Sequence, residues 1–336
     1  MNGLVTLRGA SLEGRGTLGD RAARFMDEIA RANARGEAAV MGVCNVTPDS
    51  FSDGGAFFDH ELAKARVDAL VRDGAAFVDV GGESTRPGAP RVSAAEQIAR
   101  IAPVVAYAKD LCVVSVDTTS AAVAKAALEL GAHAVNDVSL LSEPDLADVV
   151  ASFGAALVLS HARGFQADMR GFGAWPEADY GDIVDDVLAD YERARDTCVS
   201  RGVRPDVLVM DPGLGFSKST RHSLALLRRT DELVARAGAP VLIGASRKSF
   251  LVGVAVSADG VDASTTRAPP GAEDRLGASI AAALHAQAKG AAVVRVHDVR
   301  ETRQALALAS HLGERPVGAS VTRSSEPGGE RGEARC

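Results

Sequence analysis

Short apolar runs recur along the chain, and each is followed directly by a cluster of polar residues. The first run, 38–44, has the length and the β-branched content of a buried strand, and it leads into the polar segment 45–55. Seven further runs have the same form and cover 77–80, 112–116, 134–135, 156–159, 207–210, 241–244 and 293–294. Because these runs are almost continuous in apolar residues, we expect strands that are covered on both faces.

The segments between these runs have the spacing of helices. Apolar residues recur three or four positions apart, as in Val123, Ala127 and Leu130. Gly-Ala pairs such as Gly131-Ala132 often follow, which fits a helix C-terminal cap before the next strand. Eight strand-and-helix units in about 250 residues predict an α/β fold of the (β/α)8 TIM-barrel type. A doubly wound open sheet is the competing architecture.

Three segments stand outside the repeating pattern. Residues 1–37 form an N-terminal extension, in which an amphipathic helix near 20–34 either covers the bottom of the barrel or remains solvated. The barrel is expected over 38–313, with a mobile loop of small residues at 256–272. The C-terminal tail, 314–336, is rich in Gly, Ser, Arg and Glu, so we predict that it is disordered.

Composition and charge exclude several classes of protein. The 336 residues are 46% hydrophobic but only 4% aromatic, so the core must be mostly aliphatic. The net charge of -7, without a basic run, argues against nucleic acid as the partner. No stretch of about 20 apolar residues and no signal peptide occurs, so we expect neither a membrane span nor export. The four cysteines lie far apart, which favours reduced thiols in a cytoplasmic protein.

Acidic and amide side chains follow three of the predicted strands. Asp117, Asn136 and Asp211 arise from separate strand ends, which in a barrel surround one ligand. Fixed acceptors beside a donor amide suit a flat heterocycle with several N–H and amino groups. Each residue also has a structural interpretation, because Asp117 can cap the next helix and the other two can stabilise turns. Their combination favours a site for a nitrogen base.

A second polar set is basic. Lys248 follows the seventh run, while Arg295 and His297 alternate at the end of the eighth and so project to the same side. Arginine offers a planar fork for phosphate oxygens, and histidine adds a donor. Together with the Asn45 amide and the hydroxyls of 84–85, these side chains predict an anion site.

Two features of the basic set stay open. Arg295 can alternatively pair with Asp298 or with another barrel carboxylate, because a buried charge must be paired. Asn45 can help to hold a hard cation such as magnesium, which keeps several waters and bridges phosphate oxygens.

These residues together resemble the dihydropteroate synthase family. The segments that carry the resemblance are 45–55, 81–88, 115–118, 136–138, 211–216, 246–250 and 295–299. They stand in the family's order between about 40 and 309, and the combination is highly specific. The resemblance implies condensation of 6-hydroxymethyl-7,8-dihydropterin diphosphate with p-aminobenzoate, which gives 7,8-dihydropteroate and pyrophosphate in folate synthesis. It also implies Mg2+ as cofactor, a homodimer, and sensitivity to sulfonamides because the second signature loop is not expanded.

The same resemblance assigns roles to residues of this chain. It implies a pterin site of Asp117, Asn136, Asp211 and Lys248, a diphosphate site of Asn45, Thr85, Arg295 and His297 with magnesium at Asn45, and a p-aminobenzoate site of Ser249, Arg86, Pro87 and Phe216. Two loops that carry Asp49, Asp53 and Arg86 are expected to close over the substrates. The implied reaction is a dissociative substitution, in which Asp117, Lys248, Arg295 and His297 stabilise charge and Asp49 or Asp53 accepts a proton.

The sequence departs from the family pattern at two points, and two other functions stay open. Ser160 and Ser217 replace the residues that are commoner at their positions, and the adjacent His161 is interpreted as structural. A related barrel methyltransferase would bind methyltetrahydrofolate, but it has no use for the basic set. A noncatalytic paralogue would retain pterin binding or an interaction without turnover.

Overall fold

The computed structural model describes residues 20–47, 55–84, 91–164, 176, 179–251, 271 and 273–313 of the chain. The predictions for the 314–336 tail and for nearly all of the 256–272 loop therefore lie outside the described residues. The same holds for five predicted site residues, namely Asp49, Asp53, Thr85, Arg86 and Pro87.

The described residues form eight parallel strands in one sheet. The strands are β1 (Ala39–Asn45), β2 (Phe77–Gly81), β3 (Val113–Asp117), β4 (Ala134–Asp137), β5 (Ala156–Ser160), β6 (Leu208–Asp211), β7 (Leu242–Ile243) and β8 (Val293–Val296). Their order is β6-β5-β4-β3-β2-β1-β8-β7. A parallel bridge between Met210 and Val241, supported by a 2.9 Å hydrogen bond from Met210 N to Pro240 O, joins the two edges. The sheet is thus a barrel, which confirms the prediction over the open-sheet alternative.

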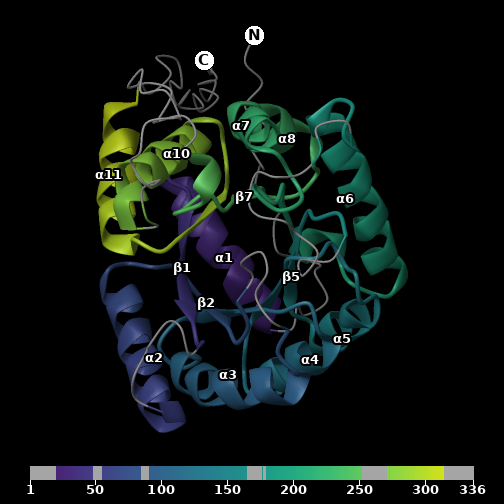
Figure 1. Cartoon of the computed structure of the whole chain (residues 1–336), viewed down its shortest axis with the longest axis vertical. Coiled ribbons are helices and arrows are strands. Elements are labelled where there is room, and N and C mark those ends of the chain that lie inside the picture. The colour runs from purple at the N-terminus through teal and green to yellow at the C-terminus, as the bar shows by residue number, and fades with distance from the viewer. Residues whose placement is uncertain are drawn as a thin grey trace, which may run out of the picture.

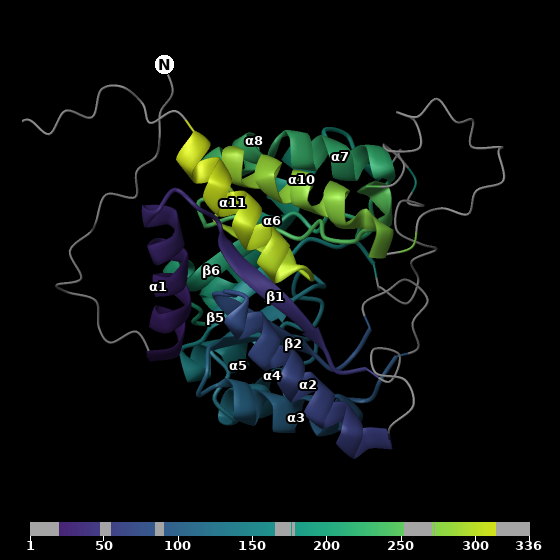
Figure 2. The ribbon, with the colours of Figure 1, turned by 90° about the vertical axis from the view of Figure 1, so that its left-hand side faces the viewer.

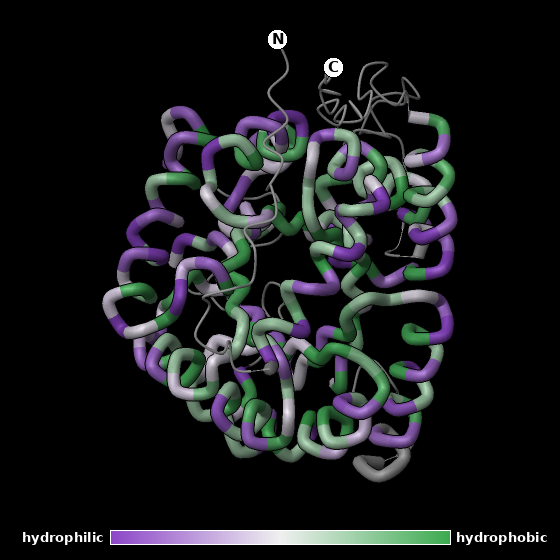
Figure 3. The backbone as a smooth tube through the Cα atoms, turned by 180° about the vertical axis from the view of Figure 1, so that it is seen from behind, coloured by the Kyte–Doolittle hydropathy of each residue, from purple (hydrophilic) through white to green (hydrophobic). Residues whose placement is uncertain are grey.

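Helices cover the sides and one end of the barrel (Figure 1). They are α1 (Asp20–Ala34), α2 (Gly55–Arg72), α3 (Ala94–Ala108), α4 (Ala121–Glu129), α5 (Asp145–Phe153), α6 (Ile183–Ser200), α7 (Thr220–Arg228), α8 (Thr230–Arg236), α10 (Leu276–Ala288) and α11 (Val299–Leu312), with 3-10 turns η4 (Pro205–Val207), η5 (Ser249–Leu251) and η6 (Glu273–Arg275). The backbone coloured by hydropathy has many hydrophilic residues on the outer turns of the helices (Figure 3). The core between helices and strands is aliphatic, as the composition predicts.

Local sequence accounts for the helix ends. Ser93 caps α3 by accepting a hydrogen bond from Glu96 N, and Asp182 caps α6 by accepting from two backbone N–H groups. Gly154 ends α5 with φ of 58°, a left-handed conformation in which glycine carries no Cβ penalty. The glycine of this predicted Gly-Ala pair therefore ends the helix, as expected.

The N-terminal helix α1 covers the end of the barrel where the strands begin (Figure 2). The ring of Phe25 lies 4.4 Å from that of Phe77, the first residue of β2, measured between centroids. Ala22 N donates a 3.3 Å hydrogen bond to Gly154 O, just before β5. Because Phe25 is fully buried, the helix covers the bottom of the barrel and is not a solvated extension.

The strand register places the polar residues in one interior layer. Asn45 pairs with Gly81, Gly81 with Asp117, and Asp117 with Asn136. Because register partners on adjacent strands project to the same face, these positions share the inward face at the carboxyl end. Asp211, paired with Ser160, continues the same face on β6. These polar side chains therefore lie together at the carboxyl end of the barrel, which we call the mouth.

Candidate active site at the carboxyl ends of the strands

A charged network from four strands fills the centre of the mouth. Arg295 on β8 donates from Nε to Asp79 Oδ2 and from Nη2 to Asp117 Oδ2, both at 2.7 Å. Asn136 donates from Nδ2 to the same Asp79 oxygen at 3.0 Å. The structure thus brings Asp117, Asn136 and Arg295 together, as the sequence predicts.

The alternative pairing of Arg295 is also observed, with two barrel carboxylates, Asp79 and Asp117, and not with Asp298. Asp298 binds Arg247 instead, through Nη2 at 2.5 Å and Nε at 3.1 Å. Arg295 uses two of its five N–H groups on Asp79 and Asp117. Pairing with barrel carboxylates and binding an anion are therefore compatible.

Burial sets the protonation of Asp117. Removal from water raises the pKa of the Asp117 carboxyl to about 7, while Arg295 opposes this shift and Asp79 adds to it. Burial alone would lower the pKa of Arg295, but the attraction of Asp79 and Asp117 raises it overall. The guanidinium therefore stays charged, while burial favours the neutral form of the Asp117 carboxyl.

Two acceptor atoms in this network have no hydrogen-bond partner among the described residues. They are Asp79 Oδ1 and Asn136 Oδ1, and both are buried. A buried acceptor without a partner is costly. The mouth therefore favours a ligand or water that presents N–H or O–H groups.

Asp211 is fixed at the opposite side of the mouth. Its Oδ2 accepts from Ser160 Oγ at 2.9 Å, and its Oδ1 accepts from Gly213 N at 2.8 Å. A Cβ on Gly244 would lie 3.8 Å from Asp211 Oδ2 and 3.9 Å from Arg295 Cβ, so glycine leaves room between these two side chains.

The amide of Asn45 borders the same space. A Cβ on Gly81 would lie 3.5 Å both from Asn45 Oδ1 and from Asp117 Cβ. No group of three or more His, Cys, Asp or Glu suited to a metal occurs in the described part of the chain. The amide oxygen alone fits a cation that takes most of its ligands from water and substrate phosphates.

Lys248 reaches the site from the loop after β7. Its Nζ donates to Leu214 O and lies 4.3 Å from the centroid of the Phe216 ring. Burial lowers the pKa of Lys248 to about 8, with Asp211 opposing and Arg295 adding to the shift. The next residue, Ser249, opens η5. Lys248 is therefore next to Phe216 in space and next to Ser249 in sequence.

His297 is held by hydrogen bonds at its ring and at its backbone. Its Nδ1 lies 3.1 Å from Ser246 Oγ, and the same hydroxyl accepts from His297 N at 3.2 Å. Arg66 fixes the His297 carbonyl through a 2.6 Å hydrogen bond. Burial and the neighbouring Arg295 lower the pKa of His297 to about 3. At neutral pH its contribution is hydrogen bonding, while positive charge comes from arginine and lysine.

Sequence reasoning missed Asp79 and Lys218. Asp79 interrupts an apolar strand in the sequence. A charged residue in such a run indicates a buried ion pair, because a buried charge must have a partner. Lys218 is fully buried and binds His161, for which the sequence indicated a structural role. His161 in turn lies 2.9 Å from Asp190 on α6.

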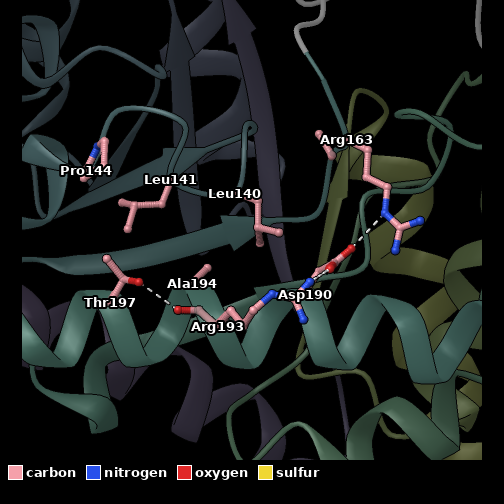
Figure 4. Close-up of a pocket in the computed structure, with 9 residues that line it drawn as sticks. Leu140, Leu141, Pro144, Arg163, Asp190, Arg193, Ala194 and Thr197 are labelled. Atoms are coloured by element: carbon pink, nitrogen blue, oxygen red, sulfur yellow. Dashed lines mark hydrogen bonds and ion pairs between the residues drawn. The ribbon is translucent and has the colours of Figure 1, made fainter.

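A cavity of about 400 Å3 lies beside this second network (Figure 4). Its lining includes Leu140, Leu141, Pro144, Ala162, Arg163, Asp190 and Arg193. Arg163 donates from Nε to Asp190 at 2.9 Å, and Arg193 also binds this carboxylate. Among the described residues, none of the predicted site residues lines this cavity.

Known proteins are similar to this chain over most of its length. The family model described as pterin binding enzyme matches residues 41–297. A dihydropteroate synthase of Mycobacterium leprae is 47% identical over 270 residues, which are 80% of this chain and 90% of that protein.

Solved structures are similar over nearly the same span. That of the Xanthomonas albilineans dihydropteroate synthase with 4-aminobenzoic acid has 36% identity and a TM-score of 0.72, covering 83% of this chain and 94% of the other. The Yersinia pestis dihydropteroate synthase in a sulfonamide drug complex has 35% identity and a TM-score of 0.72, with 83% and 95% coverage. The chain belongs to the pterin-binding enzyme family and, within it, to the dihydropteroate synthases.

Proposed function

We propose that this transferase condenses 6-hydroxymethyl-7,8-dihydropterin diphosphate with p-aminobenzoate to give 7,8-dihydropteroate and pyrophosphate. The observation that carries the proposal is the hydrogen bond of Arg295 to Asp117, which joins the predicted anion site to the predicted base site. A substrate with a flat nitrogen ring beside a diphosphate requires this adjacency. The relatives named above support the same reaction.

The pterin half is assigned to Asp117, Asn136, Asp211 and Lys248. Carboxylates and the free Asn136 Oδ1 accept the ring N–H and amino protons, and Lys248 donates to ring acceptors. Four groups on separate elements fix the orientation of a planar ring, because each has its own support. Asp211, for example, accepts from both Ser160 and Gly213 N.

The diphosphate half is assigned to Asn45, Thr85, Arg295 and His297. Arg295 supplies the permanent charge, and its remaining N–H groups are available to phosphate oxygens. Neutral His297 donates a hydrogen bond without a competing charge. Magnesium held through Asn45 would neutralise the charge of the departing pyrophosphate.

The p-aminobenzoate half is assigned to Ser249, Phe216, Arg86 and Pro87, and loop closure is assigned to Asp49, Asp53 and Arg86. Phe216 provides an apolar wall beside Lys248, and it is itself buried. A flat aromatic amine can pack against this ring while Ser249 binds the carboxylate. Closure of the loops would exclude water.

The chemistry follows from these assignments. The bond from the pterin methylene carbon to the diphosphate oxygen breaks first, and the electron pair leaves with pyrophosphate. The ring spreads the resulting positive charge beside Asp117. The neutral aniline nitrogen then forms the new carbon–nitrogen bond and loses one proton to solvent or to Asp49 or Asp53. No nucleophilic side chain is needed.

The deciding experiment is a pyrophosphate-release assay with the pterin diphosphate, with and without p-aminobenzoate. We expect release that depends on both substrates and a product with the mass of 7,8-dihydropteroate. Absence of p-aminobenzoate-dependent release from correctly folded protein would contradict the proposal and favour a noncatalytic paralogue. Methyl transfer from methyltetrahydrofolate to a corrinoid protein would instead establish the methyltransferase alternative.

The proposal extends to a cytoplasmic homodimer. Cys44, Cys112 and Cys198 are unpaired thiols, which suits a reducing compartment. In the described residues no helix has both the length and the apolar character to cross a membrane. Sedimentation equilibrium tests the assembly, and a monomeric mass at micromolar concentration would refute the dimer.

A further inference from the structure

Lys218 has a position that the proposed reaction does not use. It lies between the loop after β6 and helix α7, and its side chain is fully buried, with 0% relative exposure. Its Nζ lies 2.8 Å from His161 Nδ1, 3.2 Å from His161 O, 3.1 Å from Gly213 O and 3.0 Å from Phe216 O. A lysine amine thus sits inside a shell of acceptors.

The histidine in this shell is fixed in one tautomer. His161 Nε2 lies 2.9 Å from the Asp190 carboxylate, so this nitrogen carries the proton and Nδ1 accepts from Lys218. Burial and the adjacent Lys218 lower the pKa of His161 to about 3, which keeps the ring neutral. Arg163 binds the same oxygen of Asp190 at 2.9 Å and thereby fixes the carboxylate (Figure 4).

The loop around Lys218 presents its carbonyl groups in two directions. Gly213 O and Phe216 O accept from Lys218, whereas Leu214 O, between them, accepts from Lys248. Backbone conformation supports this division, because Gly213 and Ser217 have φ of 63° and 47°. Gly213 also approaches His161 so closely that a Cβ would lie 1.9 Å from His161 O.

We propose that Lys218 is a positioning residue, which acts on the substrate through Lys248 and Phe216. Lys218 donates to Gly213 O and Phe216 O and also binds His161, and these contacts fix the 213–217 loop. In the fixed loop, Leu214 O restrains the Lys248 amine and the Phe216 ring borders it. The inference rests on the proposed function, which assigns Lys248 to the pterin ring and Phe216 to p-aminobenzoate.

The test is a double-mutant cycle on pterin binding. Calorimetry with the pterin diphosphate, without p-aminobenzoate, gives Kd for the full-length wild type, Lys218→Met, Lys248→Met and the double variant. Lys218→Met keeps the side-chain length but removes its hydrogen bonds. We expect Lys218→Met to raise Kd roughly tenfold, as for the loss of buried hydrogen bonds, but less than about twofold when Lys248 is already Met. Equal losses in both backgrounds would overturn the proposal.

A matched control separates positioning from general destabilisation. Leu128→Ala removes a fully buried side chain on α4, away from the loop, and it should lower Tm without changing Kd. If Lys218→Met does not fold, His161→Asn and His161→Leu replace it. Asn retains an acceptor near the Nδ1 position and should bind the pterin more tightly than Leu, and equal Kd values would contradict the inference.

The outcomes also separate this inference from the proposed function. A wild type that neither binds the pterin diphosphate nor releases pyrophosphate would refute the proposed function. A wild type that does both, with a folded Lys218→Met variant of unchanged Kd, would refute the positioning role alone.

Discussion

Arg295 and Asp117 are joined by a 2.7 Å hydrogen bond between Nη2 and Oδ2, across strands that are far apart in sequence. This contact couples the two halves of the mouth. In the proposed reaction, the charge that develops on the ring and the charge of the leaving group would both interact with this ion pair.

Replacement of Asp117 by Asn should lower kcat by roughly 10²–10³-fold, as when one preorganised electrostatic group is removed. The physical reason is loss of the carboxylate beside the positively charged ring, while the side-chain shape is kept. Steady-state pyrophosphate release measures the effect. Ser115→Ala is the matched control, because Ser115 Oγ is buried on the same strand without a hydrogen-bond partner in the described structure. Near-wild-type kcat for Asp117→Asn would refute charge stabilisation.

Replacement of Asp79 by Asn should lower the free energy of unfolding by about 3 kcal/mol, the smaller end of the range for a broken buried ion pair. Asp79 is fully buried and Arg295 is 18% exposed, so water cannot replace the lost partner. Urea unfolding measures the change. Asp206→Asn removes one partner of an exposed pair with Arg204 and should cost less than about 1 kcal/mol. Equal costs would contradict the structural role of Asp79.

Protonation of Asp117 should link stability to pH. Its folded-state pKa of about 7 lies above the ordinary value of 3.8, so its contribution is fully present below about pH 4 and is lost as the pH rises through 7. His161 and His297, with pKa values lowered to about 3, act in the opposite direction up to about pH 6.5. The wild-type curve therefore mixes both trends.

The difference between two proteins isolates the Asp117 contribution. The free energy of unfolding of the wild type minus that of Asp117→Asn should fall between pH 5 and pH 8, as measured by urea unfolding without substrates. Lys248 adds little slope over most of this range, because its lowered pKa is about 8. A difference that stays constant across the range would show that Asp117 titrates at its ordinary pKa.

The fold and much of the site could be predicted because they depend on local patterns. Eight apolar runs with helical segments between them specify a barrel, and a barrel brings strand ends to one mouth. Asp117, Asn136 and Arg295 therefore meet as predicted. The partners of Arg295 could not be chosen in the same way, because several barrel carboxylates were available and only the folded structure selects Asp79 and Asp117.

Other features depend on three-dimensional packing that the sequence pattern does not contain. The inward position of Lys218 results from the positive φ values of its loop and from the close approach of Gly213 to His161. Strand β7 is shorter than its apolar run, since only Leu242 and Ile243 have strand geometry. In both places contacts between distant segments outweigh the local preference.

Sulfonamides should inhibit the enzyme competitively with p-aminobenzoate. Phe216 and Ser249 lie beside Lys248, where an aromatic amine with an acidic group can bind. The Yersinia pestis relative was solved in a sulfonamide drug complex. Initial rates at several concentrations of both compounds test the prediction, with a raised KM for p-aminobenzoate and unchanged kcat as the expected pattern. Full turnover at saturating sulfonamide would contradict it.

Two glycine substitutions should separate steric conflict from backbone strain. Gly213 and Gly238 have nearly equal φ values of 63° and 65°, so alanine is strained at both positions. At Gly213 the new Cβ would also lie 1.9 Å from His161 O, whereas at Gly238 nothing lies within 4 Å.

Gly238→Ala should therefore lower the free energy of unfolding by about 1 kcal/mol and leave turnover normal, as for a left-handed residue without a clash. Gly213→Ala must move the loop that supports Lys248, so it should lower Tm further and reduce kcat/KM at least roughly tenfold, as a small misplacement of positioning groups does. Thermal unfolding and steady-state kinetics on both variants measure these effects, and equal behaviour of the two would show that the approach of Gly213 to His161 has no functional role.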